Sequence, residues 1–546
     1  MRELFTDEPP LVTVLTSLAA GTDQLGAAVA LKLGQQLDVV FPFREPSYPA
    51  HPEFTPPQSK MLHLLAAKAR QTITLDGDYS SEQGRETAYT DARDLLLQNA
   101  DLLVAVYAQN APRRPGGTVD TVHRAIESGL PVVRIILNAN QAQVSTRPIL
   151  DCVRELLVLP ELESHELKDA LQRLAMMSGE ATPPVVCTDS QLESLFKGTW
   201  DALHDLAGDC APEELHQELP SSADINDDIT LQPFAKFYDR ASDLTLFFMR
   251  TYRGAFVLSY VLAGLAVAAA VSMLAVTIAC SPDHPPLAAI VVLAAVKIAI
   301  LVTLLLLQRE GRKGRWQEAA ADFRYLAELL RPMQWMHPVG TYPSAVELPL
   351  HTAPHDLRRT WMAWLVRALT RSAVCASANA PQKVTIDARA GSAALERAAD
   401  EWIAGQIVYH AKAAARMQIL LEGLERLASV LLWIVLGSAV VAAVMEIGHV
   451  KAAVIFGAIA AILPAFIAAI AGITFQSEAK RLAMRSRAMH EALRRQADVL
   501  RDKARDPKLD GTGRTARLLL KELSAMTIRE ASDWKVLYQV HEIHAG

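Results

Sequence analysis

The sequence predicts an α/β domain followed by an all-α membrane region with four spanning helices in two hairpins. Two observations carry this prediction. Strand-like and helix-like segments alternate over the first quarter of the chain, and four long apolar segments occupy its middle and end. The chain has 546 residues, of which 51% are hydrophobic and 21% charged, a mixture typical of soluble domains joined to membrane segments.

The apolar segments define the membrane region. They cover residues 255–280, 287–307, 427–447 and 452–475. Each reaches the roughly 20 residues that a helix needs to cross a bilayer core. Buried helices of a large soluble core are the alternative, but such helices are rarely this long with so few charges. Short turns at 281–286 and 448–451 pair the spans into two hairpins.

Basic residues predict the orientation of the hairpins. Lysine and arginine gather on the sides of the spans away from the turns, and the turns hold only Lys451. By the positive-inside rule, both hairpin tips face outward and both termini lie in the cytoplasm. The protein is therefore expected to be a multi-pass membrane protein whose soluble parts are cytoplasmic.

Lys297 lies near the middle of the second span, where a charged side chain is costly. One interpretation is a residue that lines or gates a pore. The other is a lysine that snorkels or pairs with a neighbouring helix. Alanine and glycine are abundant in all four spans, which permits close helix packing and predicts a homo-oligomer.

The chain contains an internal repeat. A helix-like stretch precedes each hairpin and a charged helix follows it, so the unit is helix, two spans, helix. The flanking helices form either a stalk that assembles with other copies or a bundle within one chain. A further helix at 355–371 fits either the membrane surface or the side of these helices. The boundaries are 1–205 for the α/β domain, 206–233 for an acidic linker, 234–335 for the first unit, 336–385 for a second linker and 386–546 for the second unit.

The first quarter of the chain predicts a Rossmann-like fold with a parallel sheet. Strand-like runs occupy residues 11–15, 37–43, 72–75, 101–108 and 131–137, and helix-like runs occupy 22–34, 60–70, 87–100 and 118–129. In such sheets, ligands bind beyond the carboxyl ends of the strands.

Two loops at that edge carry glycine and hydroxyl residues. One is "TSLAAGTD", residues 16–23, and the other contains Gly116, Gly117 and Thr118. Glycine lets the backbone approach a phosphate, and the amides of a helix N-terminus bind anions. An isolated Gly-Gly is more often a plain turn, but two such loops in one sheet predict a nucleotide pocket.

These stretches resemble two known families. Residues 11–137, and most specifically the two loops, are similar to the SLOG superfamily, Rossmann-like domains related to the LOG enzymes and to DprA proteins. The membrane units, most clearly from "EWIAGQIVYHAKAAARM" to "ASDWKVLYQ", are similar to the SLATT family. SLATT domains are two-span effectors proposed to form pores in bacterial conflict systems, where they are often coupled to SLOG domains.

The resemblance implies a set of ligand-binding residues and a location in the bacterial inner membrane. The residues that it places near a nucleotide are Ser17, Gly21, Thr22, Asp23, Arg44, Tyr89, Gly116, Gly117 and Thr118. For Tyr89, simple helix packing is an equal alternative.

The chain departs from the SLOG pattern in two places. Its first strand-like run matches the second strand of the family, which leaves one wall of the pocket in doubt. LOG enzymes also carry a catalytic glutamate after their glycine-rich motif, whereas this chain offers Asp120, Thr121 or His123 there and no glutamate before Glu127. That difference favours binding over hydrolysis.

Other functional classes lack support in the sequence. The net charge of −6 predicts no nucleic-acid partner. The sequence has no phosphate loop of the GxxxxGK[ST] type, no HExxH or GxSxG motif and no Cys/His cluster, so we expect no cofactor, metal or catalytic residue.

The expected function is a membrane effector in antiphage defence. A cyclic or NAD-derived nucleotide would bind the α/β domain and gate or assemble a pore, killing the infected cell. The alternative is a membrane-anchored enzyme that hydrolyses a glycosidic bond, with Asp23 or Asp120 as acid/base. A scaffold that recruits a partner is a third possibility.

Overall fold

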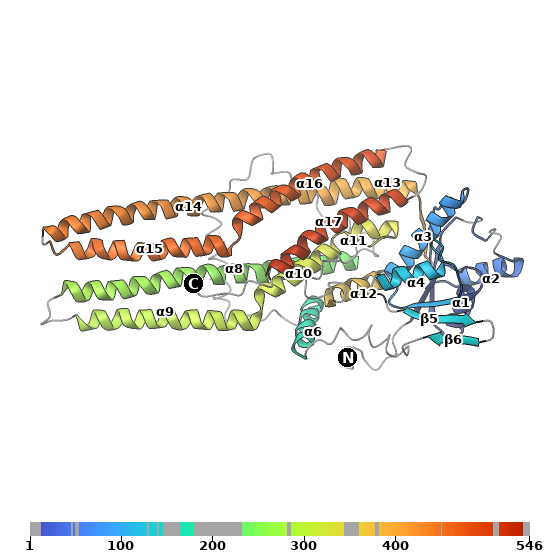
Figure 1. Cartoon of the computed structure of the whole chain (residues 1–546), viewed down its shortest axis with the longest axis horizontal. Coiled ribbons are helices and arrows are strands. Elements are labelled where there is room, and N and C mark those ends of the chain that lie inside the picture. Colours follow the sequence, from blue (N-terminus) through green and yellow to red (C-terminus); the bar gives the residue numbers. More distant parts are fainter. Residues whose placement is uncertain are drawn as a thin grey trace.

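The structure is a computed structural model. It describes residues 12–44, 47–49, 54–127, 130, 132–138, 141–145, 164–179, 232–280, 286–342, 360–376, 382–448, 450–505 and 513–538. Most of the predicted acidic linker, up to residue 231, and the first hairpin turn, at 281–285, lie outside these ranges. The molecule is elongated, with two long helical hairpins at one end, further helices in the middle and the strands at the other end (Figure 1).

The structure confirms the predicted small parallel sheet with helices in the α/β region. Its first sheet has the order β1-β2-β3-β7 and is parallel throughout. A second sheet joins β4 to β5 in parallel and β5 to β6 in antiparallel fashion. The strands are β1 Thr13–Thr16, β2 Gln36–Phe41, β3 Gln71–Leu75, β4 Leu103–Ala108, β5 Val132–Asn138, β6 Gln141–Ser145 and β7 Gln382–Ile386. The helices are α1 Thr22–Lys32, α2 Pro56–Ala66, α3 Glu82–Asn99 and α4 Thr118–Glu127. The five predicted strands thus divide between two sheets, and β6 and β7 add to them.

Strand β7 comes from a segment that the sequence assigned to a linker. It pairs with β3 in a register that places Val384 beside Ile73, and Ile386 is fully buried. The next residue, Asp387, caps helix α13 by accepting a hydrogen bond from the Ala390 amide at 2.9 Å. The strand therefore leads directly into a helix.

That helix runs without interruption from the sheet to the far end of the molecule. It consists of α13 (Ala388–Arg397), a π-helical turn (Ala398–Ile403) and α14 (Ala404–Ile447). Together these make 60 residues, which at 1.5 Å per residue extend about 90 Å. At the π-helical turn, Trp402 stacks on Trp335 with ring centroids 5.5 Å apart, and Trp335 donates a hydrogen bond to Glu401.

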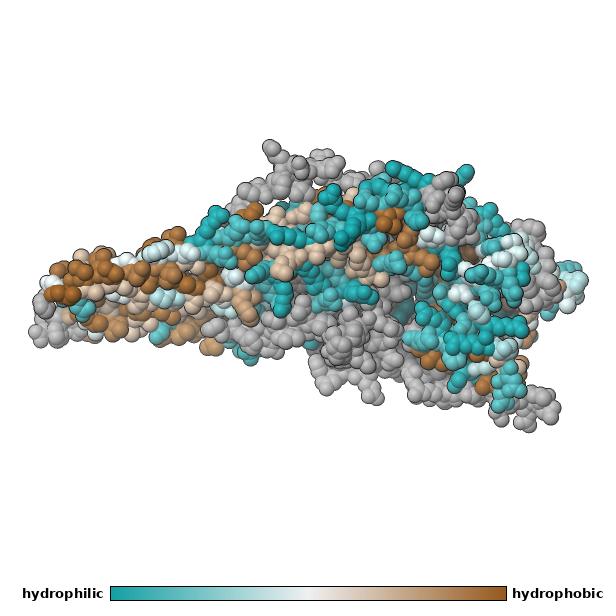
Figure 2. All heavy atoms as spheres, turned by 45° about the horizontal axis from the view of Figure 1, so that its top comes forward, coloured by the Kyte–Doolittle hydropathy of each residue, from teal (hydrophilic) through white to brown (hydrophobic). Residues whose placement is uncertain are grey.

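Four helices are long and apolar enough to span a membrane, as predicted. The helices of the helical region are α6 Ser164–Ser178, α8 Gln232–Ala279, α9 Leu287–Gly314, α10 Trp316–Leu330, α11 Met333–Met336, α12 Trp361–Ala376, α15 Ala453–Gln476, α16 Ala479–Arg505 and α17 Arg514–Tyr538. The candidate spans lie in α8, α9, α14 and α15, and their surface forms the hydrophobic end of the molecule (Figure 2).

The two hairpins share a further structural feature. In each, the first helix is continuous from the polar region into the span, whereas the second helix is broken. The breaks fall at Arg315 and Glu478, whose φ angles of 43° and 49° lie in the left-handed region. A residue in that region cannot continue a right-handed helix, so α10 and α16 begin in new directions.

The candidate spans pack as a row in the order α9, α8, α15, α14 (Figure 1). Two glycines allow the central helices to approach closely. A Cβ on Gly264 of α8 would lie 3.2 Å from the ring of Phe466, and a Cβ on Gly472 of α15 would lie 2.3 Å from the ring of Tyr260. Each helix thus accepts an aromatic ring over its glycine, as small residues permit in membrane helix pairs.

Helix α10 forms the centre of the middle region. It packs against α8, α12 and α17, and nearly all of its residues are buried. Phe323 stacks on Phe248 of α8, and the ring of Trp361 at the start of α12 meets it edge-on. The apolar face of α12 is therefore covered by neighbouring helices of the same chain.

Replacing Gly472 with alanine should destabilise the helix row. The new methyl group would overlap the Tyr260 ring, and overpacking of this kind costs about 1–3 kcal/mol. We expect thermal unfolding of the detergent-solubilised variant several degrees below that of the wild type. Gly457→Ala is the matched control, because no described atom lies within 4 Å of a Cβ there. Equal effects of the two substitutions would refute the close approach.

His410 should make the stability depend on pH. Its side chain is only 6% exposed, and burial lowers its pKa from 6.5 to about 4. The unfolded chain therefore binds more protons than the folded one between these two values, so stability is complete above pH 6.5 and falls as the pH falls toward 4. At pH 5 the loss should be about 2 kcal/mol. Melting temperatures are measured at pH 7.5 and pH 5. The difference between the two should be smaller for His410→Leu than for the wild type. The control His123→Leu, at an exposed histidine, should show the same difference as the wild type.

Candidate functional site

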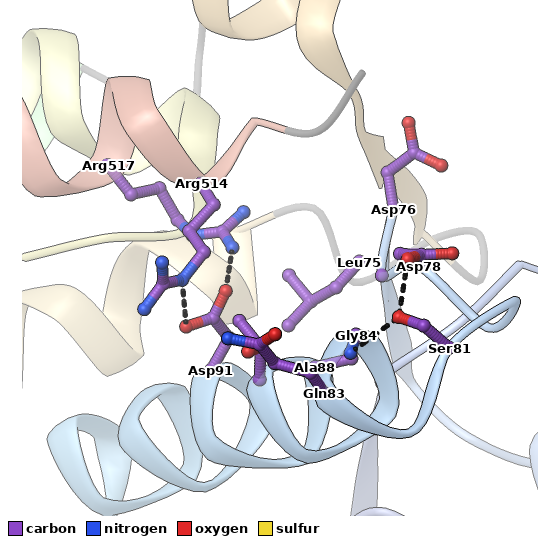
Figure 3. A pocket seen from close by; sticks show the side chains of 12 residues that line it. Leu75, Asp76, Asp78, Ser81, Gln83, Gly84, Ala88, Asp91, Arg514 and Arg517 are labelled. Carbon is purple, nitrogen blue, oxygen red and sulfur yellow. Dashed lines mark hydrogen bonds and ion pairs between the residues drawn. The ribbon is translucent and has the colours of Figure 1, made fainter. Parts of the chain in front are cut away.

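A cavity of about 310 Å³ lies at the carboxyl end of β3, between the first turns of α3 and the start of α17 (Figure 3). This is the edge of the sheet where parallel α/β folds bind ligands, and the volume is at the low end for small-molecule sites. Its lining combines carboxylate, guanidinium, hydroxyl and amide groups. The lining residues are Leu75, Asp76, Gly77, Asp78, Ser81, Gln83, Gly84, Thr87, Ala88, Asp91, Arg514 and Arg517.

The N-terminus of α3 forms one wall. The Ser81 hydroxyl accepts a hydrogen bond from the Gly84 amide at 3.0 Å and donates one to Asp78 at 3.1 Å. Hydrogen bonds from the hydroxyl and amide of Ser80 lower the pKa of Asp78, which keeps this carboxylate ionised. A Cβ on Gly84 would lie 2.4 Å from the Asp78 carboxylate, so only glycine allows the loop to close on the helix.

The opposite wall comes from the C-terminal part of the chain. Asp91 of α3 accepts hydrogen bonds from Arg514 at 3.1 Å and from Arg517 at 3.0 Å, one on each carboxylate oxygen (Figure 3). Asp91 and Arg517 are largely buried, which strengthens the interaction relative to a surface pair. This clamp fastens α17 to the α/β region.

Arg44 holds a second set of carboxylates at the mouth of the cavity. Its guanidinium lies 2.9 Å from Asp76, which follows β3, and 3.3 Å from Asp387, which follows β7. Burial raises the pKa of Asp76, the charge of Arg44 lowers it, and repulsion from Asp387 raises it, with a net upward shift. Arg44 was predicted to bind a ligand; it does not line the cavity itself, but it pairs with Asp76, which does.

The first predicted loop is closed on itself. Asp23 accepts hydrogen bonds from the Thr16 hydroxyl at 3.0 Å and from the backbone amides of Ala19 and Ser17. Burial nevertheless raises the pKa of Asp23 above its ordinary value. Gly21, at a φ of 101°, and Thr22 are exposed at the start of α1. Two backbone amides of this loop, those of Ser17 and Ala19, are thus engaged by Asp23 and are not directed at a ligand.

The Gly116–Gly117–Thr118 loop serves close packing. A Cβ on Gly116, whose φ is 70°, would lie 2.6 Å from the Cβ of Tyr89, so the loop presses on the backbone of α3. Asp120 accepts a hydrogen bond from the Gly116 amide and pairs with Arg93 and Arg113. Burial alone would raise the pKa of Asp120, but these partners bring it below its ordinary value.

Aromatic packing accounts for Tyr89. Its ring meets Phe43 edge-on at 5.4 Å, within a cluster that also contains Leu18 of the first loop. Within the described residues, none of the nine predicted binding residues lines the cavity at α17. Lys297 lies elsewhere, half-buried on α9 between the exposed Val296 and Ile298.

Part of the site had a signal in the sequence. "DGDYSSEQG" (76–84) directly follows a predicted strand and combines two aspartates with a serine cap, but it is not one of the two loops predicted to bind a ligand. No signal in the sequence marked the two arginines of the cavity, because Arg514 and Arg517 lie more than 400 residues away from Asp91 in the chain.

Other features of the described residues are weaker candidates for a ligand-binding site than the cavity at α17. A shallower hollow of about 490 Å³ lies between α16 and α17, but it has an apolar floor and involves no residue of the α/β region. Nowhere in the described ranges do three His, Cys, Asp or Glu side chains gather closely enough to hold a metal ion. No family model, no curated protein and no solved structure matches the chain.

Removing the charge of Asp91 should loosen α17. Asp91→Asn weakens two charge-assisted hydrogen bonds to arginines, at a cost of about 2 kcal/mol. We expect faster amide hydrogen exchange in the first turns of α17 and a lower melting temperature. Glu86→Gln, at an exposed position of the same helix, is the control and should leave both unchanged. Unchanged exchange in Asp91→Asn would mean that the clamp does not hold α17.

Proposed function

We propose that the protein is a nucleotide-sensing membrane effector. Its α/β region, a Rossmann-like sensor, binds a small cyclic or NAD-derived nucleotide. The helical region then gates or assembles a pore in the bacterial inner membrane, with both termini in the cytoplasm, as a defence against phage. The resemblance of the two regions to SLOG and SLATT domains supports this proposal, as do the four apolar helices.

One observation carries the proposal: the cavity is built jointly by the α/β region and by α17 of the helical region. A ligand there contacts both parts at once. Its affinity therefore depends on how α17 sits against α3, and a ligand shifts a conformational equilibrium only through such a difference in affinity. A cavity enclosed by one domain alone would lack this property.

The chemistry of the cavity suits a nucleotide. Arg514, Arg517 and the N-terminus of α3 offer positive charge to a phosphate. The carboxylates of Asp76 and Asp78 can accept hydrogen bonds from ribose hydroxyls or from an exocyclic amine. A phosphate at the arginines would compete with Asp91 for them, so binding would weaken the clamp that fastens α17.

Two connections lead from the cavity to the spans. Asp387, at the mouth, begins the helix that continues through α14. Helix α17 packs along α10, which follows the first hairpin. Movement of α17 or of β7 would thus reach both hairpins through rigid helices.

The alternative hypothesis, a hydrolytic enzyme, requires a carboxylate that is free to act as an acid or base. The two acid/base candidates, Asp23 and Asp120, are engaged by internal hydrogen bonds and ion pairs instead. This favours binding without turnover.

The decisive test is to incubate the detergent-purified protein with a panel of cyclic and NAD-derived nucleotides. Melting temperature and recovery of the intact nucleotide by mass spectrometry are measured in the same samples. We expect at least one nucleotide to raise the melting temperature, to be recovered intact and to release dye from liposomes that contain the protein. Recovery as free base and sugar phosphate would establish the enzyme instead.

Cavity-filling variants locate the binding site. Thr87→Trp places an indole in the cavity and should abolish the thermal shift and the leakage. Glu86→Trp puts the same group on the exposed side of α3 and should retain both. A ligand response that survives Thr87→Trp would place the site elsewhere.

A further inference from the structure

The repeat of the two hairpins extends to individual residues of their first helices. Residues 253–271 of α8 align without gaps with residues 426–444 of α14, and more than half of the paired positions are identical. Tyr260 corresponds to Trp433, and Gly264 corresponds to Gly437. Both helices thus carry an aromatic ring four residues before a glycine, which places the two on one face.

In α8 this face is covered by α15. Phe466 lies over Gly264, and Tyr260 lies over Gly472. Further along the same side of α15, Ala469 and Ile473 are buried. The contact joins the first helix of one repeat to the second helix of the other.

In α14 the equivalent face is open. Trp433 is 73% exposed, and no described atom lies within 4 Å of a Cβ placed on Gly437. The neighbour of α14 in the row is α15, which covers a different side of the helix that includes the buried Ser438.

Helix α9 carries the matching open face. It aligns with α15 through "QREGRK" (308–313) and "QSEAKR" (476–481), so that Ile298 takes the place of Phe466. Leu301 and Leu305 then take the places of Ala469 and Ile473. In α15, Ala469 and Ile473 are buried and Phe466 is partly buried, whereas Ile298, Leu301 and Leu305 of α9 are 61%, 44% and 66% exposed.

We propose that α9 of one copy docks on α14 of the next and repeats the contact between α15 and α8. The order of the row supports this pairing. In the row α9-α8-α15-α14, the second helix of a hairpin alternates with the first helix of a hairpin (Figure 1). A following copy whose α9 lies against α14 continues this alternation. The partner is a second copy of this chain, because only it presents the α9 face.

The contact is heterologous, since each copy uses α14 on one side and α9 on the other. Such contacts generate rings if the rotation closes and open arcs or filaments if it does not. A ring or arc of spanning helices is the arrangement that the proposed pore requires. The inference deepens the proposed function and rests on it only in placing the four helices in a bilayer.

The contact between copies should be weaker than the internal one. At the position of Gly472, α9 carries Leu304, which leaves no recess for the Trp433 ring. Leu304→Ala opens such a recess and should increase assembly. A gain of assembly from a smaller side chain is not an effect of misfolding.

Cysteine cross-linking in membranes tests the interface. In a chain whose five native cysteines are replaced, Gly437→Cys combined with Ile298→Cys should give a ladder of dimers and larger species on oxidation. Each single variant should give none, and co-expressed single variants should give only the mixed dimer. Ala439→Cys with Ile298→Cys is the matched control, because Ala439 lies within one turn of Gly437 on another exposed face, and it should cross-link several-fold less.

The internal pair Gly264→Cys with Phe466→Cys reports folding, because it should cross-link within one chain. If this pair forms but the Gly437–Ile298 ladder does not, with and without the nucleotides of the panel, the interface is refuted. Dimers from Gly437→Cys alone would also refute it, in favour of a two-fold contact. If the ladder forms but no nucleotide causes liposome leakage, the interface stands and the proposed function fails.

Discussion

Parallel pairing of β7 with β3 is the interaction on which the arrangement of the molecule depends. It inserts a strand from the segment just before the second repeat into the sheet of the N-terminal region and sets where the 60-residue helix begins. Two other segments pack against the end of β7. A Cβ on Gly340, just beyond the first repeat, or on Gly513, just before α17, would lie 2.5 Å or 3.0 Å from the Ile386 side chain. The end of β7 is thus a junction of three distant segments.

Charged pairs connect the α/β region to the helices around this junction. Arg44 reaches Asp387, Arg514 and Arg517 reach Asp91, and Arg367 of α12 approaches Asp101 at 4.0 Å. Most of these side chains are partly exposed, and exposed ion pairs contribute little net stability. The helical row, in contrast, is held by apolar packing around glycine. Apolar packing also crosses the boundary, because Ile73, Leu75 and Leu95 belong to the same buried cluster as residues of α10 and α17.

The sequence predicted the features that depend on local pattern. Apolar length located the four spans, and the alternation of short strands and helices located the first five strands, because both signals lie within a few turns of chain. At Gly116 the structure shows a reason for glycine that residue type alone does not reveal, because a Cβ there would press on the backbone of α3. Strand β7 is five residues long and its partner lies 311 residues earlier, so no local period marks it. The arginines of α17 join the cavity for the same reason: only the fold brings them there.

The pairing of β7 also ties completion of the cavity to the order of synthesis. When a ribosome has made the first 380 residues, the first hairpin is complete, but β3 is paired on one side only, because β7 is missing, and Asp91 lacks both arginines. Pairings this distant in sequence form late in folding, because a long loop must close first. The cavity therefore comes into existence only after α17 has emerged. A nascent or truncated chain, although it already carries the long apolar helices, therefore lacks one wall of the cavity.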